Sequence, residues 1–397
     1  MLRYSRAAFE ILLIIVFCAW VGLPGGAMLA GQRARPALME SRVEIPLAGV
    51  HAVDFPPVFY RFFQSSFAFR DRLIRLHALI KVKWLAVSPS PGVLVGEGGW
   101  LYYWADGERE CCEASRPLTQ EELAKWQTVL ETRRDWLARR GAKFLFVVVP
   151  DKHTIYPEHL PGYLRHAGRE SRLDQLLAYL RGRSNVEILD LRQALLSEKG
   201  RHQVYFKLDT HWDRIGAFIG YREILSRLAR WFPEVRVPQW EDVEIAPAQA
   251  GQHDLIDFLG MGAGDLSDPV LSAIPKRPRP ARVLADDPRV LDNGNAVVDV
   301  IISDSPGAAI PRAVVLRDSA AMSLIPLLSE HFGHATYLWT TDPYRRQVER
   351  EHPNVVIWEM TERWLMLPPP QPWVERARPT PPAPTRDAND DTPIPPT

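Results

Sequence analysis

The hydrophobic and polar positions in the middle of the chain alternate between two periods, one typical of helices and one typical of buried strands. Apolar residues recur at helical spacing between Thr119 and Arg140, and Thr119 with Glu122 forms a capping box ahead of them. Gly141 ends this predicted helix, and an unbroken apolar run at residues 143–150 follows it. Such a run is typical of a strand that is buried on both faces of a parallel sheet.

The same alternation continues towards the C-terminus. The pattern predicts helices near residues 173–181 and at 191–199, 213–231 and 321–332, and strands at 186–190, 204–206, 313–318, 335–339 and 354–360. Helices that alternate with buried strands predict an α/β domain of three layers, with a parallel sheet between two layers of helices.

Two segments depart from this alternation. Residues from about 233 to 311 are rich in Pro, Gly and Asp and contain only short β-like pieces, so we interpret them as a β-containing insertion packed on the main sheet. Residues 71–84 precede the first predicted strand and are expected to be helical.

Both ends of the chain differ from the middle. In residues 1–31, Arg3 and Arg6 precede an apolar run, which is the pattern of a signal peptide or an uncleaved signal anchor; a buried core helix is the alternative. We therefore expect the bulk of the protein outside the cytoplasm, with the N-terminal segment as a membrane anchor if it is not cleaved. Residues 367–397 are rich in proline and predict a disordered tail. The domain is then expected within residues 32–366.

Composition narrows the function classes. The chain has 48 Lys and Arg and 48 Asp and Glu, so no basic excess points to nucleic acid as a partner. Cys111 and Cys112 are adjacent and Cys18 lies in the apolar segment, which is neither a disulfide framework nor metal-ligand spacing. A vicinal disulfide, a pairing between chains and incidental loop residues stay open for the adjacent pair. We predict no cofactor and no metal.

The stretch DTHW is the first candidate for chemistry. Asp209 and His211 are two residues apart after a predicted strand, and in extended backbone such residues point the same way. Asp209 would then orient one ring nitrogen of His211, leaving the other to take a proton from a nucleophile. A structural histidine with a local partner is the alternative. A metal pair is less favoured because no further ligand residue stands near at ligand spacing.

Ser319 is the second candidate. It follows the buried strand at 313–318 and opens the helix predicted at 321–332, so it is expected at the carboxyl edge of the sheet. Free N–H groups of that helix would lie near the serine oxygen, as in an oxyanion hole. A simple N-cap serine is the alternative. Because ligand sites collect at this edge, Asp209, His211 and Ser319 form a credible triad in that chain order.

Several co-linear motifs resemble the alginate O-acetyltransferase family of the AlgJ/AlgX type, which has an SGNH-hydrolase-like domain. The resembling segments are FAFRDRLI (67–74), VLVGEGGWLYY (93–103), VVVPDKHTIYPEHLP (147–161), DTHWDRIGAFIGY (209–221), GDL (264–266), RDSAAMSLIPLLSEHF (317–332) and NVVIWEMTERWL (354–365). The usual GDSF reads RDSA here, with Arg317 and Ala320, which affects the acceptor pocket more than the nucleophile.

The resemblance implies a fold, an activity and partners. The fold is SGNH-hydrolase-like with a circularly permuted motif order. Ser319 is implied as nucleophile, His211 as general base and acid, and Asp209 as its orienting carboxylate. The implied activity is acetyl transfer to an exopolysaccharide such as alginate, with acetyl groups supplied by a membrane-bound O-acyltransferase in an export complex. An acetyl esterase with the same triad and a non-catalytic polysaccharide-binding component are the rival hypotheses.

Other residues near the predicted sheet edge carry weaker hypotheses. Lys152 and Tyr156 are candidates for binding a sugar or an oxyanion, Trp212 for a wall of the site, and Arg317 for orienting substrate. A solvated lysine, a core tryptophan and an arginine paired with a carboxylate are the respective alternatives for Lys152, Trp212 and Arg317. Asp318 is expected to cap the helix after it. His153 and His159 are expected at the surface, and Trp100, Tyr102 and Tyr103 in packing rather than in a sugar platform.

Overall fold

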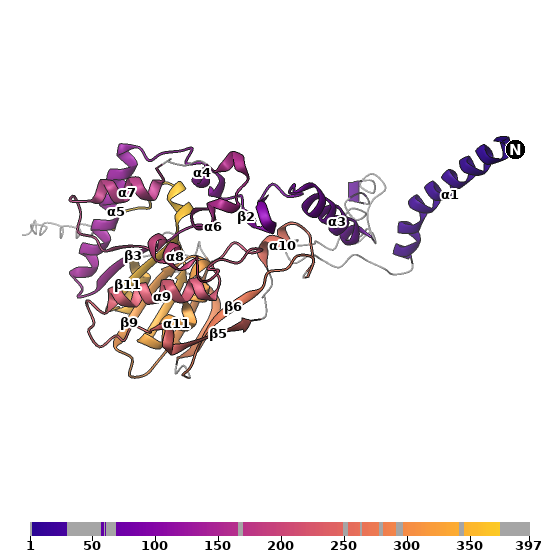
Figure 1. Cartoon of the computed structure of the whole chain (residues 1–397). Helices are drawn as coiled ribbons and strands as arrows, with labels where there is room; N and C mark the ends of the chain where they lie inside the picture. The colour runs from indigo at the N-terminus through magenta and orange to yellow at the C-terminus, as the bar shows by residue number, and fades with distance from the viewer. Residues whose placement is uncertain are drawn as a thin grey trace, which may run out of the picture.

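The computed structural model describes residues 2–29, 57–58, 60, 69–165, 170–248, 253–262, 264–277, 281–290, 297–340 and 345–373 (Figure 1). Its main body is built around one seven-stranded sheet. The strands follow the order β4 (Ile188–Asp190), β3 (Lys143–Val149), β11 (Val355–Thr361), β9 (Ile310–Arg317), β10 (Phe332–Trp339), β8 (Val297–Asp304) and β7 (Arg282–Val290). The first five strands are mutually parallel, and β8 and β7 are antiparallel to their neighbours.

Helices cover both faces of this sheet, because successive residues of a strand point to opposite sides. In β3, Leu145 and Val147 belong to one apolar cluster, and Phe146 and Val148 to the other. The first cluster includes residues of α6 (Lys152–Ile155), α8 (Arg192–Glu198), α9 (Arg214–Leu228) and α11 (Ile325–Leu328), and the second includes residues of α5 (Gln120–Ala138), α7 (Arg172–Leu180) and α12 (Arg345–Glu351). The three-layer α/β prediction is confirmed.

The N-terminus of α5 shows how closely local sequence can specify an element. Thr119 accepts a hydrogen bond from the Glu122 amide, and the Glu122 carboxylate accepts one from the Thr119 amide. Gly141 follows the helix with a φ of +76°, a left-handed conformation that glycine adopts without strain. Both the predicted start and the predicted stop are confirmed.

The insertion predicted at about 233–311 is more closely joined to the sheet than expected. Its β5 (Val243–Ala248) and β6 (Val270–Pro275) form a separate antiparallel ribbon, and α10 (Asp254–Phe258) lies between them in sequence. Its β8 pairs with β10, and β7 pairs with β8, so the insertion supplies two strands of the main sheet. The sheet is therefore mixed at one edge rather than parallel throughout.

The described ends of the chain refine the expected domain limits. The apolar N-terminal segment forms α1 (Leu2–Leu29), and no helix in the described ranges is both long and apolar enough to cross a membrane. At the other end, Trp373 is buried and stands edge-on to Trp136, with ring centroids 5.0 Å apart. The packed domain thus continues past residue 366. The rest of the predicted tail lies outside the described residues.

Candidate active site

Asp209 and His211 lie on a tight loop rather than after a strand. Residues 204–206 were predicted to be a strand, but Tyr205 makes only an isolated bridge with Trp212. The Phe206 amide donates to the His211 carbonyl at 3.2 Å, and the Asp213 amide donates to the Val204 carbonyl at 3.1 Å. The ends of this catalytic-candidate loop, residues 204–213, therefore pair with each other and satisfy the backbone groups that a sheet neighbour would otherwise have satisfied.

The predicted pairing of Asp209 with His211 is present. Asp209 Oδ1 lies 2.7 Å from His211 Nδ1 and also accepts the His211 amide at 2.9 Å. The His211 Nε2 atom is buried and has no hydrogen-bond partner among the described residues. One ring nitrogen is thus held by a carboxylate and the other is left available, which is the arrangement a general base needs.

The charges of this pair stabilise each other. Burial raises the pKa of Asp209, but its hydrogen bonds and the charge of His211 outweigh burial and lower that pKa to about 2. Burial likewise opposes the charged form of His211, yet the hydrogen bond and charge of Asp209, helped by the charge of Asp254, raise the pKa of the imidazole above its ordinary value.

Lys152 supports the loop from the carboxyl end of β3. Its Nζ donates to the carbonyls of Phe206, Lys207 and Asp209 at 2.9, 3.3 and 2.6 Å, so its hydrogens are fully used. Burial lowers its pKa to about 8. Lys152 is neither a solvated lysine nor free to meet a substrate. The sugar-binding hypothesis for it is replaced by a structural one.

Tyr156 also holds the loop instead of facing a substrate. Its hydroxyl accepts the Val204 amide at 3.0 Å, and its carbonyl accepts the Tyr102 hydroxyl at 2.7 Å. Its ring packs on Trp100 with centroids 4.4 Å apart, and all three of these aromatic side chains are buried. The packing interpretation of Trp100 and Tyr102 agrees with this structure, and Tyr156 belongs to the same packed group.

The insertion completes the support of the loop from the opposite side. The Asp254 amide donates to Asp209 Oδ2 at 3.0 Å, and Asp254 Oδ1 accepts the Thr210 amide at 2.8 Å. Asp254 Oδ2 lies 3.9 Å from His211 Nδ1. Asp268, also from the insertion, accepts the Lys207 amide at 2.7 Å. Sequence reasoning missed Asp254, because nothing in the sequence ties the first residue of α10 to a loop so far upstream.

Ser319 follows β9, at the edge where the strands of the parallel sheet end, as predicted. The helix expected at 321–332 is instead broken into a 3-10 turn η6 (Ala320–Ser323), α11 and a second 3-10 turn η7 (Ser329–His331). Pro326 explains the break, since a proline within a helix removes a donor and clashes with the preceding turn. The Ala320 amide is already donated to Asp318 Oδ1 at 2.8 Å. The Ser319 amide makes no hydrogen bond to any other described residue and stays available as a donor.

Trp212 joins the two halves of the predicted triad. Its indole Nε1 donates to the Ala320 carbonyl at 2.9 Å, so the residue after His211 bonds the residue after Ser319. Trp212 is buried, and its ring contacts the backbone of α9 at Gly220, where an added Cβ would lie 2.8 Å from it. It is therefore a core residue and not an exposed wall. A hydrogen bond between Ser319 Oγ and His211 Nε2 is not present in this structure.

Arg317 and Asp318 hold the serine turn in place. Arg317 is fully buried and donates to Asp299 Oδ2 at 2.7 Å, which is the carboxylate-pairing alternative and not substrate orientation. Asp318 Oδ2 accepts hydrogen bonds from the Thr361 amide and the Trp364 indole, each at 2.8 Å. Asp318 thus caps the turn after it and ties it to the end of β11.

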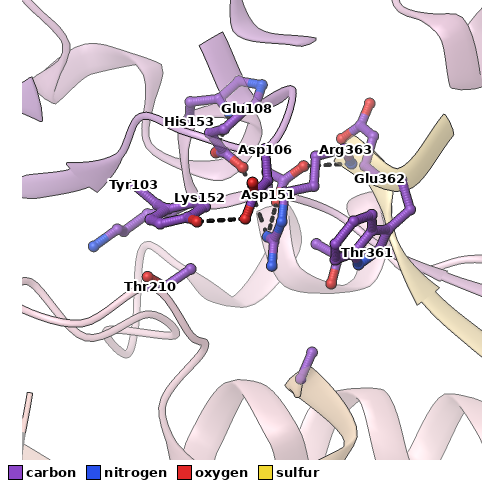
Figure 2. A network of polar contacts seen from close by, with 12 residues as sticks. Tyr103, Asp106, Glu108, Asp151, Lys152, His153, Thr210, Thr361, Glu362 and Arg363 are labelled. Atoms are coloured by element: carbon purple, nitrogen blue, oxygen red, sulfur yellow. Dashed lines mark hydrogen bonds and ion pairs between the residues drawn. The ribbon is translucent and has the colours of Figure 1, made fainter. Parts of the chain in front are cut away.

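A buried charged network lies beside the site, at the ends of β3 and β11 (Figure 2). Glu108, Asp151 and Arg363 are turned towards one another, and Arg363 donates to both Asp151 oxygens at 2.7 Å. His153 Nδ1 lies 2.7 Å from Glu108 Oε1. Burial, with the neighbouring Glu108 charge, raises the pKa of Asp151 well above its ordinary value. His153 is buried, whereas the sequence placed it at the surface.

Among the described residues, two groups of side chains have the spacing of metal ligands. Glu108, Asp151 and His153 form one group, and Asp209, His211 and Asp254 form the other, with ligand atoms within 4.8 Å of one another in each. Asp254 corrects the expectation that no further ligand residue stands near the Asp209–His211 pair. In the first group the Arg363 guanidinium already balances Asp151. In the second, protein N–H groups occupy the oxygens of Asp209.

Cys111 and Cys112 are free thiols at the end of α4 (Glu108–Cys112). Burial raises the pKa of both, to about 12 for Cys112, so neither thiol is a nucleophile at neutral pH. The vicinal disulfide that the sequence left open is not formed.

A groove with a volume of about 640 Å³ opens beside the serine turn. Met322 and Ser323 line one side, and Ile274 of β6 lines the other. Arg214 and Arg277 are exposed and also line it, and no carboxylate among the described residues lies within ion-pair distance of either. A groove lined by cations without an ion-pair partner among the described residues suits a ligand that carries negative charge.

The fold and the sequence match define the class as an SGNH-hydrolase-like acetyltransferase domain. The family model described as "SGNH hydrolase-like domain, acetyltransferase AlgX" matches residues 93–297, and the chain belongs to this family. The chain is 26% identical over 293 residues to a probable alginate O-acetylase AlgJ of Pseudomonas syringae pv. tomato, with 69% of each chain covered. It is 27% identical over 296 residues to the Pseudomonas putida protein of the same description, with 70% of this chain and 71% of that one covered.

A solved structure agrees with the fold. Bacillus cereus PatB1 superposes with a TM-score of 0.51 at 17% sequence identity, over 69% of this chain and 96% of that one. The SGNH-hydrolase-like fold expected from the motifs is confirmed.

Proposed function

We propose that this chain is an O-acetyltransferase that moves acetyl groups onto hydroxyls of an extracytoplasmic polysaccharide through an acyl-Ser319 intermediate. One observation carries the proposal. Asp209 holds His211 Nδ1 while Nε2 stays unpartnered among the described residues, and Trp212 fixes this loop against the turn that Ser319 begins. Catalytic hydrogen bonds are often long without substrate and form only in the productive complex, so the open Ser319–His211 contact fits this proposal.

The first half-reaction transfers the acetyl group to the enzyme. His211 Nε2 takes the proton of Ser319 Oγ, and the oxygen attacks the acetyl carbonyl of the donor. The Ser319 amide stabilises the negative oxygen that develops on that carbonyl. The bond to the donor's leaving group breaks, the leaving group takes the proton from His211, and acetyl-Ser319 remains.

The second half-reaction transfers the acetyl group to the sugar. A sugar hydroxyl loses its proton to His211 Nε2 and attacks acetyl-Ser319. The Ser319 ester bond breaks, the proton returns from His211 to Ser319 Oγ, and an O-acetylated sugar leaves. Asp209 and Asp254 offset the positive charge that the imidazole carries in both steps.

The groove beside η6 is the proposed acceptor site. Relatives of the chain are named as probable alginate O-acetylases, and an alginate-like acceptor carries carboxylates that match Arg214 and Arg277. We further propose the periplasm as the location and a membrane-bound O-acyltransferase within an export complex as the donor of acetyl groups.

The test is covalent trapping of the intermediate. The full chain is incubated with a chromogenic acetyl ester and quenched, and the Ser319 peptide is weighed by mass spectrometry. We expect an acetyl adduct on Ser319 that is lost in Ser319→Ala and His211→Ala. Ser226→Ala, at an exposed serine of α9, is the control and retains the adduct.

Oligosaccharide acceptors then distinguish the rival reactions. Acetylated oligosaccharide formed at the expense of free acetate supports the transferase, whereas acetate alone, at every acceptor concentration, supports the esterase. A folded protein that forms no adduct and turns over no ester would sink the enzymatic proposal and favour a polysaccharide-binding role.

A further inference from the structure

The segment formed by α3 (Arg70–Leu79) and the π-helical turn η1 (Ile80–Trp84) carries an exposed apolar stripe. Trp84 is 80% exposed and Leu76 is 53% exposed, and Leu73 and Ile80 lie on the same side at helical spacing. Leu85 and Val87, just after η1, extend the stripe. Large apolar side chains that gather on one exposed surface mark a contact with another phase or molecule.

The helix that carries this stripe is firmly held by its other face. Ala78 and Val82 are buried in an apolar cluster that also contains Leu255 of α10 and Leu208 of the catalytic-candidate loop. Arg75 donates to both oxygens of Asp265, at 2.8 and 2.5 Å. Figure 1 shows α3 beside α10, outside the layers of the main body. The stripe is therefore the outer surface of a docked element with two apolar faces, and described residues cover only one of them.

Positive charge accompanies the stripe. Arg72, Lys81 and Lys83 lie on the segment, and no carboxylate among the described residues lies within ion-pair distance of any of them. The one acidic residue between positions 70 and 87 is Asp71, which lies 3.6 Å from Arg70. Trp and Leu side chains on one side with Lys and Arg beside them are the composition of helices that lie in the interface of a bilayer with anionic lipids.

We propose that the surface formed by residues 72–87 docks on a lipid bilayer that carries anionic headgroups. A second observation on the same N-terminal arm supports a lipid over a protein partner. In α1, the apolar side chains from Phe9 to Phe17 are all more than half exposed, from 52% at Leu13 to 68% at Phe17. Two helices in the N-terminal part of the chain that both present exposed apolar side chains suit a continuous apolar phase.

This docking would place the candidate active site close to the membrane. Leu208 and Ala78 belong to one apolar cluster, and Leu208 precedes Asp209, so a single packed layer separates the docking surface from the loop. The docking proposal does not depend on the triad, so its test is independent of whether Ser319 forms an acetyl adduct.

The experiment reads the surface directly by hydroxyl-radical footprinting of the full chain. The probes are saturated-chain phosphatidylcholine vesicles with and without phosphatidylglycerol. We expect oxidation of Trp84 and Leu76 to fall about threefold or more with phosphatidylglycerol vesicles, because an interfacial helix buries its apolar face. Tyr163 and Trp339, which are 69% and 45% exposed elsewhere, are internal controls and stay unchanged.

Charge variants test the headgroup part of the proposal. Lys81→Gln with Lys83→Gln should weaken vesicle binding through this surface by about fivefold for each lysine removed. Lys125→Gln, on the exposed side of α5, is the matched control.

Three results would overturn the proposal. If vesicles lower oxidation only at residues 9–17, the lipid contact belongs to α1 alone. Protection of Trp84 that appears without vesicles as protein concentration rises would assign the stripe to a second copy of the chain. If vesicles protect Trp84 equally in the wild type and in the Lys81→Gln, Lys83→Gln double variant, the anionic headgroups play no part in docking.

Discussion

His211 is bonded to one carboxylate and approached by a second. Asp209 makes the short bond, and Asp254 stands 3.9 Å away while its backbone and its other oxygen clamp the loop. Two negative neighbours favour the protonated imidazole, and Arg363 opposes them weakly. Because its pKa is raised, His211 is a stronger base, but its neutral and active form is populated only at a higher pH.

Asp254→Asn separates the charge of Asp254 from its clamping role. Asparagine keeps the amide and a side-chain oxygen for Thr210 but loses the charge, so the pKa of His211 should fall. Because activity needs neutral His211, the acid limb of the pH profile of kcat/KM should move to lower pH. An unmoved acid limb with lower activity throughout would mean that Asp254 acts only as a clamp.

Lys152→Met tests the buried ammonium under the loop. Three carbonyls would lose their donor, so the free energy of unfolding should fall by about 3 kcal/mol, and ester turnover should fall with it. Denaturant unfolding measures the first effect. Lys125→Met, on a side chain that is 60% exposed, should change stability by less than about 0.5 kcal/mol. A Lys152→Met variant that keeps its stability but loses acetyl transfer would return Lys152 to the candidate substrate ligands.

At the scale of elements, patterns between neighbours in the sequence predicted structure well. Contacts between segments that lie far apart in the sequence could not be predicted. The capping box at Thr119 and the apolar run of β3 need only neighbours in sequence, and both were predicted. Residues 204–206 look like a strand because their aromatic and β-branched composition suits one, but Tyr205 donates its hydroxyl to the Pro150 carbonyl and the segment closes on itself. Pro326 was present in the sequence and could have shortened the predicted helix.

The same limit applies to the site. Asp209, His211 and Ser319 stand out as candidates because their local patterns carry chemistry, and the structure brings their loops together through Trp212. Their catalytic roles stay predictions. The roles of Lys152, Tyr156 and Arg317 could not, because a buried polar side chain is distinguished from a substrate ligand only by its partners. Asp254 comes from an insertion whose contact with the loop leaves no mark in the sequence.

Gly216 tests the fit between α9 and the catalytic-candidate loop. A Cβ there would overlap the Val204 carbonyl and lie 3.0 Å from Cβ of Trp212. Gly216→Ala should therefore cost about 2 kcal/mol of stability and lower turnover, because it pushes the loop from the serine turn. Gly200→Ala is the control, since no heavy atom lies within 4 Å of its added Cβ. Equal melting temperatures for both variants would show that the loop gives way freely.

At the scale of the whole molecule, charge is balanced overall yet uneven locally. The formal net charge is zero, but Arg214 and Arg277 face the groove without an ion-pair partner among the described residues. Charge that is concentrated in one cleft steers an anionic polymer to that cleft.

Arg214→Gln and Arg277→Gln should each raise KM for a carboxylate-bearing oligosaccharide, by up to about fivefold, and leave turnover of a small neutral ester unchanged. The effect should shrink as salt is added. Arg230→Gln, whose side chain is 63% exposed and pairs with Glu187, serves as the control. An unchanged KM for both variants at low salt would place the acceptor elsewhere.

The position of β11 bears on when the molecule can assemble during synthesis. It is the last strand in the described sequence, yet it lies between β3 and β9 and is the one described strand that joins the two. Until it emerges, the nascent chain holds two unconnected pieces of sheet, and Asp318 lacks Thr361 and Trp364. Contacts of such long sequence separation form late. Activity should therefore appear in one step when the final strand inserts, and an incomplete chain should remain loose and without acetyl-transferring capacity.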